Sequence, residues 1–231
     1  MIFFQQQEWN DSLQELQAIF GSRLVCLGLQ GSYRRGEATP TSDLDLVLIL
    51  DVFSSEDLRA YRDWVRRSPM ADKLCGFVSG KAELLAWPKA DLFQFYHDTQ
   101  PLAGTLDWLQ LRIQPADAWE AVRVGAANLY HAVCHSYLFE DRASNLRELY
   151  KSPFFILQAK VYCETGEYFS SQEALLPRVS PVDRKILDIC VGRKVIFSGS
   201  LSDQAIADFY DLLLTWCGGL LRWCQQEKTN T

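Results

Sequence analysis

Two aspartates at the start of an apolar segment have the residue type and the spacing to bind a metal ion. Asp43 and Asp45 flank Leu44, where the apolar run Leu44–Leu50 begins. The run predicts a buried strand, and side chains alternate along a strand, so both carboxylates should share a face, roughly 6–7 Å apart at Cα. Such a pair is costly unless a cation offsets the charge. Oxygen ligands suit Mg²⁺ or Mn²⁺, so we predict that Asp43 and Asp45 are metal ligands.

A glycine and a serine upstream of these aspartates could bind an anion. Gly31 and Ser32 follow the apolar run Leu24–Leu29, which also predicts a buried strand. Gly31 allows close approach of the backbone to a ligand, and Ser32 opens a short helical turn whose free N–H groups can bind phosphate oxygens. The alternative is an ordinary turn, with the two aspartates facing solvent from an edge strand.

The elements around these residues alternate between helix and strand. Apolar periodicity predicts the order α-β-β-α-β, with elements at Trp9–Phe20, Leu24–Leu29, Leu44–Leu50, Ser55–Arg67 and Leu74–Val78. The aromatic run Leu92–Tyr96 predicts a fourth strand, and residues 101–114 read as a connecting segment.

From Pro115 onward the apolar period changes to that of a helix. Two long helical stripes, Trp119–Tyr137 and Ile206–Cys224, enclose shorter helical stretches at Phe154–Tyr162 and Val182–Cys190. We therefore predict an α+β protein, in which a small mixed-sheet core over residues 1–112 precedes a helical bundle domain over residues 113–231.

Composition limits the classes of partner. The net charge of −6 argues against a nucleic-acid binder, since such proteins meet phosphates with Lys and Arg. Apolar runs are too short for a membrane span, and the start of the sequence lacks the basic region of a signal peptide. Seven scattered cysteines without a C-x-x-C pair favour a reducing cytoplasm. The sequence leaves the oligomeric state open.

The spacing of the glycine, serine and aspartates resembles a known signature. The motif of the DNA polymerase beta-like nucleotidyltransferase superfamily is similar to two segments of this sequence, Gly31-Ser32-x-x-Arg35-Gly36-Glu37 and the following Ser42-Asp43-Leu44-Asp45. The resemblance implies a nucleotidyltransferase core, with ATP as co-substrate and Mg²⁺ or Mn²⁺ as cofactor. It assigns the two aspartates to the metal and to catalysis. The nucleotide would be bound by Gly31, Ser32, Arg35 and Ser42.

The second half resembles a narrower group. Ile156–Glu167 and Ser171–Ala174 are similar to the helical domain of the streptomycin and spectinomycin adenylyltransferases. This resemblance implies transfer of AMP from ATP to a hydroxyl of a small acceptor of the aminoglycoside kind, with release of pyrophosphate. The alternative is a catalytically weak module that binds a nucleotide or a protein partner.

Superfamily members add a third carboxylate, which completes the metal site or acts as base toward the incoming hydroxyl. The predicted strand Leu74–Val78 carries no acid. The nearby candidates are Asp72, Glu83, Asp91 and Asp98. We assign Asp98 as the catalytic candidate; its alternative role is a turn cap before Thr99.

Overall fold

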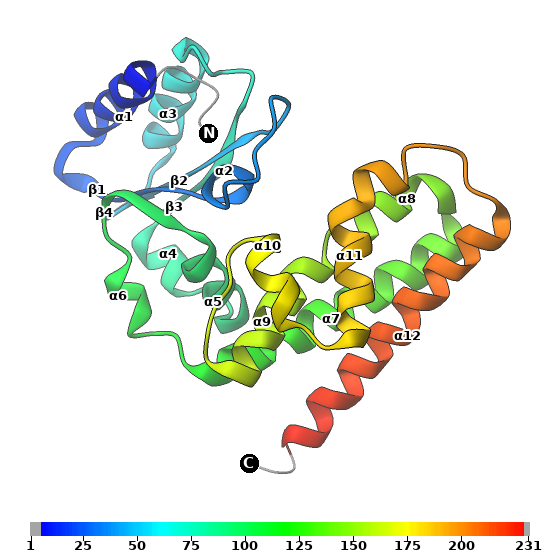
Figure 1. The fold of residues 1–231 in the computed structure, drawn as a ribbon. Coiled ribbons are helices and arrows are strands. Elements are labelled where there is room, and N and C mark those ends of the chain that lie inside the picture. Colours follow the sequence, from blue (N-terminus) through cyan, green and yellow to red (C-terminus); the bar gives the residue numbers. More distant parts are fainter. Residues whose placement is uncertain (1–5, 229–231) are drawn as a thin grey trace. The chain divides into compact units, whose positions relative to one another are not determined.

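The computed structural model describes residues 6–228, which divide between Ile113 and Gln114 into two compact units (Figure 1). The first unit contains a four-stranded sheet with helices, and the second is helical. The predicted α+β class is confirmed. Within the described residues, no helix has the length and apolar character needed to cross a membrane.

The sheet of the first unit is mixed. Its strands are β1 (Leu24–Leu29), β2 (Leu44–Leu50), β3 (Leu74–Gly80) and β4 (Gln100–Gly104), in the order β3-β2-β1-β4. β2 is parallel to β3, whereas β1 is antiparallel to both of its neighbours, β2 and β4. The ends of β1, β2 and β4 that meet at the same edge are therefore the end of β1 and the starts of β2 and β4.

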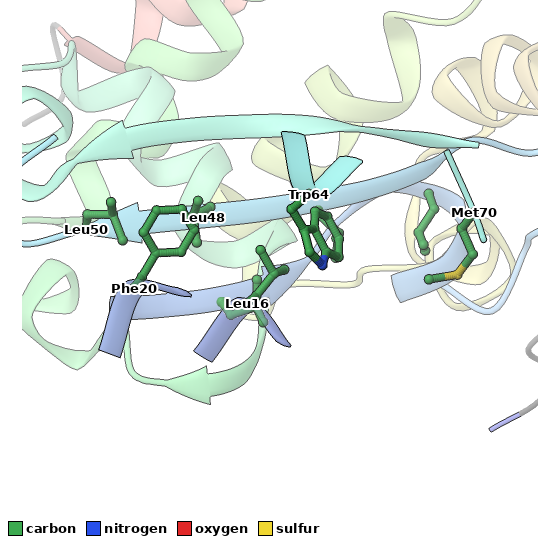
Figure 2. Packing of buried hydrophobic residues seen from close by; sticks show 9 residues of the cluster. Leu16, Phe20, Leu48, Leu50, Trp64 and Met70 are labelled. Carbon is green, nitrogen blue, oxygen red and sulfur yellow. The ribbon is translucent and has the colours of Figure 1, made fainter. Parts of the chain in front are cut away.

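One face of the sheet is covered by α1 (Gln6–Phe20) and α3 (Ser55–Arg67) (Figure 1). Alternate residues of β2, including Leu48 and Leu50, meet Leu16 and Phe20 of α1 and Trp64 of α3 (Figure 2). All five side chains are at most 3% exposed. Burying a large apolar side chain stabilises the fold by about 1.5–3 kcal/mol, so this layer fixes the position of β2.

The opposite face of the sheet is covered by α4 (Lys81–Leu85), α5 (Lys89–Asp98) and α6 (Asp107–Gln110). The strand predicted at Leu92–Tyr96 is wrong, because these residues lie in α5. The helix buries Ala90, Leu92, Phe93 and Phe95, so the run Leu92–Tyr96 is apolar at every position except Gln94. A short buried helix and a buried strand have the same apolar signature, and aromatic content favoured the strand. The fourth strand is instead β4, in the segment read as a connection.

Helix α3 begins with a buried carboxylate. Asp57 is 4% exposed and accepts hydrogen bonds from Ser54 N (2.9 Å), Ser54 Oγ (2.8 Å) and Arg23 Nη2 (2.7 Å). Ser54 Oγ accepts in turn from Asp57 N, which completes a capping box. The hydrogen bond from Arg23 is the largest cause that lowers the pKa of Asp57 to about 2.

We expect Asp57→Asn to lower the free energy of unfolding at pH 7 by about 1–2 kcal/mol, the typical worth of a cap. The folded pKa of about 2 lies below the unfolded value, so the stabilisation is complete above pH about 4 and is lost as pH falls toward 2. The difference in the free energy of unfolding between wild type and variant, measured by urea unfolding, should therefore disappear as the pH falls from about 4 toward 2. Asp63→Asn, at an exposed position of the same helix, is the control. A gap that stays constant down to pH 2.5 would contradict the account.

The second unit is built from α7 (Pro115–Phe139), α8 (Arg142–Leu149), α9 (Pro153–Thr165), α10 (Gln172–Leu175), α11 (Pro181–Ile196) and α12 (Asp203–Lys228). α7 packs against both α9 and α12. The residues of α7 that are buried in this packing recur every three or four positions: Ala118, Val122, Ala126, Leu129 and Val133.

A buried charged cluster joins three of these helices. Lys160 of α9 contacts Asp183 of α11 at 2.9 Å and Glu164 at 2.6 Å. Trp216 Nε1 of α12 donates to the other oxygen of Asp183 at 2.8 Å. Because each buried charge has a partner, the cluster specifies how α9, α11 and α12 meet.

Candidate functional site

The turn after β1 lies directly against the second aspartate of the motif. Gln30 N donates to the backbone oxygen of Asp45 at 2.9 Å, which extends the β1–β2 ladder by one step. The chain then enters the short helix α2 (Gly31–Arg34), and Gly31 adopts φ +68°. A Cβ atom on residue 31 would overlap the Asp45 carboxylate. Glycine is therefore required here twice, for the left-handed backbone and for the space that the carboxylate fills.

The two motif aspartates differ in exposure. Asp43 is exposed immediately before β2, and Asp45, the second residue of the strand, is partly buried. The next alternate residues, Val47 and Ile49, pack on the face that carries α4 and α5, so Asp45 belongs to that face. On the neighbouring strand β3, Asp45 is paired with Cys75, and β3 carries no acid.

Asp98 reaches the same turn from the other side. It is the last residue of α5, is 8% exposed, and precedes β4. The backbone N–H of Gly31 interacts with its carboxylate and lowers its pKa. Leu29 of β1 pairs with Leu46 of β2 and with Gln100 of β4, so Asp45 and Asp98 flank Gly31 from opposite sides.

The other three candidates for the third carboxylate lie elsewhere. Asp72 is exposed before β3, Glu83 lies in α4, and Asp91 is in the first turn of α5. Of the four acids, Asp98 is the one whose contact with the Gly31 turn is established.

A buried arginine adds positive charge to the site. Arg35 Nη1 lies 3.4 and 3.5 Å from the two carboxylate oxygens of Asp98, and its Nε donates to Glu37 Oε2 at 3.1 Å. The side chains of Arg35 and Asp98 are each 11% exposed. Arg34 Nη2 donates to the backbone oxygen of His97 at 3.2 Å. The predicted nucleotide-binding residue Arg35 is thus engaged by two carboxylates.

Burial perturbs two neighbouring side chains of α5. It raises the pKa of Asp98, although Arg35, Arg34 and the Gly31 N–H oppose that rise. Burial, together with the charge of Arg34, lowers the pKa of His97 to about 4. His97 is therefore neutral at pH 7, and the positive charge near Asp98 comes from the two arginines.

The two serines of the motif lie in different turns. Ser32 is partly buried in α2, and its backbone oxygen accepts from Glu37 N at 2.8 Å. Ser42 Oγ accepts from Thr39 N at 2.9 Å, and lies 3.1 Å from the Thr39 hydroxyl. The loop before Asp43 is therefore a hydrogen-bonded turn.

Asp43 and Asp45 supply two carboxylates, so a divalent ion bound there would take its remaining ligands from water and substrate. Across residues 6–228, no group of three or more His, Cys, Asp or Glu side chains is placed to hold a metal ion. Mg²⁺ is usually bound through one or two carboxylates, with waters and substrate phosphates completing the shell. Asp43 and Asp45 fit that requirement.

Sequence reasoning missed a link behind the turn. Gln30 Nε2 donates to Thr99 Oγ1 at 2.6 Å, and Thr99 Oγ1 donates to Phe95 O at 2.6 Å. The link fixes the end of β1 to the residue after Asp98. Gln30 and Thr99 are 69 positions apart, and no local pattern marks such a contact.

Comparison with known proteins gives one family match and one structural match. Residues 11–95 match the family described as "Nucleotidyltransferase domain". No curated protein matches the sequence. Among solved structures, the chain is similar to spectinomycin adenyltransferase AAD(9) from Enterococcus faecialis, determined with ATP and spectinomycin. The TM-score is 0.57 at 10% identity, with 94% of this chain and 100% of that chain covered. The family match confirms the resemblance of residues 11–95 to the nucleotidyltransferase superfamily, and the structural match confirms that the fold resembles that of a spectinomycin adenyltransferase.

Proposed function

We propose that the protein is a metal-dependent nucleotidyltransferase that moves AMP from ATP to a hydroxyl group of a small molecule and releases pyrophosphate. The observation that carries the proposal is the close contact of Gly31 with the Asp45 carboxylate, together with the interaction of the same turn with Asp98. A phosphate-binding turn, a metal-binding pair and a candidate base then share one edge of the sheet. The match of residues 11–95 to the nucleotidyltransferase domain supports the same reaction class.

In this proposal different residues bind the metal and orient the phosphates. Asp43 and Asp45 hold the metal, which when bound neutralises charge on the triphosphate and makes the acceptor hydroxyl more acidic. The turn at Gly31 and Ser32 and the loop at Ser42 orient the phosphates. Most of the rate enhancement in phosphoryl transfer comes from positioning and charge stabilisation, so these contacts are the main catalytic elements.

Asp98 is proposed as the base. It would take the proton of the acceptor hydroxyl while the new O–P bond forms and the bond to the pyrophosphate oxygen breaks, with the electron pair leaving on pyrophosphate. A carboxylate whose pKa is raised by burial is a better base near neutral pH than an exposed one. General-base catalysis contributes about 10²–10⁴-fold.

Amino-sugars are the acceptors to test first. The net charge of −6 favours cationic partners over anionic ones. The similar solved structure contains spectinomycin together with ATP. We propose a cytoplasmic location, in keeping with seven cysteines that all lie within the described residues and form no disulfide there.

A second candidate is a nucleotide-binding or partner-binding module of low catalytic power. Two observations favour it: the described residues contain no three-carboxylate metal cluster, and Asp98 is paired with Arg35. Such a module would bind ATP with Mg²⁺ but would release no pyrophosphate.

A pyrophosphate-release assay distinguishes the two candidate functions. Each nucleoside triphosphate is supplied with Mg²⁺ or Mn²⁺ and a panel of amino-sugars and simpler alcohols. We expect release with ATP that depends on both metal and acceptor, together with an acceptor product heavier by one AMP in mass spectrometry. Metal-dependent ATP binding without pyrophosphate from any acceptor would favour the second candidate.

A further inference from the structure

The Arg35 guanidinium lies between two carboxylates rather than in solvent. Its Nε contacts Glu37 at 3.1 Å, and its Nη1 faces both oxygens of Asp98 at 3.4 and 3.5 Å. The Arg35 side chain is 11% exposed and that of Glu37 is 23% exposed. A planar guanidinium held on one edge by Glu37 presents its other edge to Asp98 in a fixed orientation.

The contact with Arg35 affects the charge of Asp98 because the Asp98 carboxylate is buried. Its carboxylate is removed from most solvent, and an ionised carboxylate in such a place needs charged or hydrogen-bonding partners. The partners are the Gly31 N–H and the positive charges of Arg35 and Arg34. His97, next to it on α5, is neutral at pH 7. Of the two arginines, Arg35 is the one whose guanidinium faces the Asp98 oxygens, since Arg34 donates to the His97 backbone oxygen.

We propose that Arg35, oriented by Glu37, is a positioning residue that keeps Asp98 ionised and directed at the Gly31 turn. This inference rests on the proposed function for its catalytic consequence. Arg35 then acts through Asp98 and has no direct contact with the triphosphate. The proton accepted from the acceptor hydroxyl goes to the Asp98 carboxylate, and Arg35 neither gains nor loses a proton.

Removal of the positive charge should therefore change the titration of Asp98. An opposite charge within about 4–6 Å lowers a carboxyl pKa by about 1–3 units. In Arg35→Gln the buried Asp98 keeps the Gly31 N–H and the charge of Arg34, so its pKa should rise by about 1 unit or more. In Arg35→Lys the charge remains and the rise should be smaller.

The first test reads Asp98 directly and needs no turnover. The side-chain carboxyl ¹³C resonance of Asp98, assigned with Asp98→Asn, is followed against pH in wild type, Arg35→Gln and Arg35→Lys. Arg62→Gln, at an exposed position of α3, is the control. The expected result is the largest rise of the Asp98 pKa in Arg35→Gln, a smaller rise in Arg35→Lys, and no change in Arg62→Gln. An unchanged Asp98 titration in folded Arg35→Gln would overturn the inference.

The second test separates positioning from phosphate binding. In Arg35→Gln we expect kcat to fall on the order of 10²-fold, because the Asp98 carboxylate is no longer directed at the Gly31 turn. The acid limb of the pH profile should move to higher pH, the dissociation constant for ATP with Mg²⁺ should stay within about 2-fold, and Arg35→Lys should recover part of the rate. An ATP affinity weakened tenfold or more, with an unmoved pH profile, would make Arg35 a phosphate ligand and refute the inference. If wild type proves inactive with every acceptor, the proposed function fails, and the titration still decides whether Arg35 controls Asp98.

Discussion

Asp45→Asn is expected to abolish metal-dependent pyrophosphate release, lowering kcat/KM on the order of 10³-fold. The substitution preserves the shape of the side chain next to Gly31 but removes the negative charge that would bind the cation. Charge stabilisation by a metal is worth several kcal/mol in the transition state, and each 1.36 kcal/mol is a factor of ten. The rate is measured with saturating ATP and the acceptor that gives the highest release.

The control for this change lies at the other end of the same strand. Asp51 follows β2, is exposed, and its carboxylate accepts from Val52 N. Asp51→Asn makes the same chemical change far along the strand, and we expect near wild-type turnover. Asp43→Asn should resemble Asp45→Asn, since both aspartates are proposed to hold the metal. Near wild-type activity of Asp45→Asn would refute the assignment of the metal site.

Gly31→Ala should have the second largest effect. A methyl group at this position would overlap the Asp45 carboxylate, so either the turn or the carboxylate must move. The left-handed backbone at φ +68° adds a cost of about 1–2 kcal/mol for a residue with a Cβ. We expect turnover to fall at least about 10²-fold, because displacements of about 1 Å can cost that much in a site that works by positioning.

Two other glycines separate the backbone cost from the clash. Gly21 and Gly36 have φ +56° and +73°, and a Cβ at either position would meet nothing within 4 Å. Gly21→Ala and Gly36→Ala should therefore lose only the backbone part of the stability in urea unfolding, less than Gly31→Ala loses, and show much smaller losses of turnover. Equal losses of turnover in all three variants would show that contact with Asp45 is not the cause.

The local part of the site could be predicted from the sequence. The elements Leu24–Leu29, Leu44–Leu50 and Ser55–Arg67 were predicted with the bounds that the structure has. Their apolar periodicity is strong and their ends carry turn or capping residues. The glycine and aspartate spacing also depends on nearby positions alone, because one strand and one turn place all of these residues.

The non-local part could not be predicted in the same way. The run Leu92–Tyr96 is apolar on nearly every side because α5 is buried, so its pattern did not distinguish helix from strand. Because the fourth strand was placed at Leu92–Tyr96, β4 was not predicted. The start of β4 pairs beside the end of β1, and this pairing is what brings Asp98 close to Gly31. The contact between Arg35 and Asp98 spans 63 positions and depends on that pairing.

The most direct test of the account is to locate the metal with Mn²⁺ and ATP in the ¹⁵N-labelled protein. Paramagnetic Mn²⁺ broadens the amide signals of nearby residues. Addition of Mn²⁺ with ATP should broaden the amides of Gly31, Ser32 and Asp45 first, and this broadening should be lost in Asp45→Asn. Broadening centred on another part of the chain, or the same broadening of these amides in Asp45→Asn, would contradict the account.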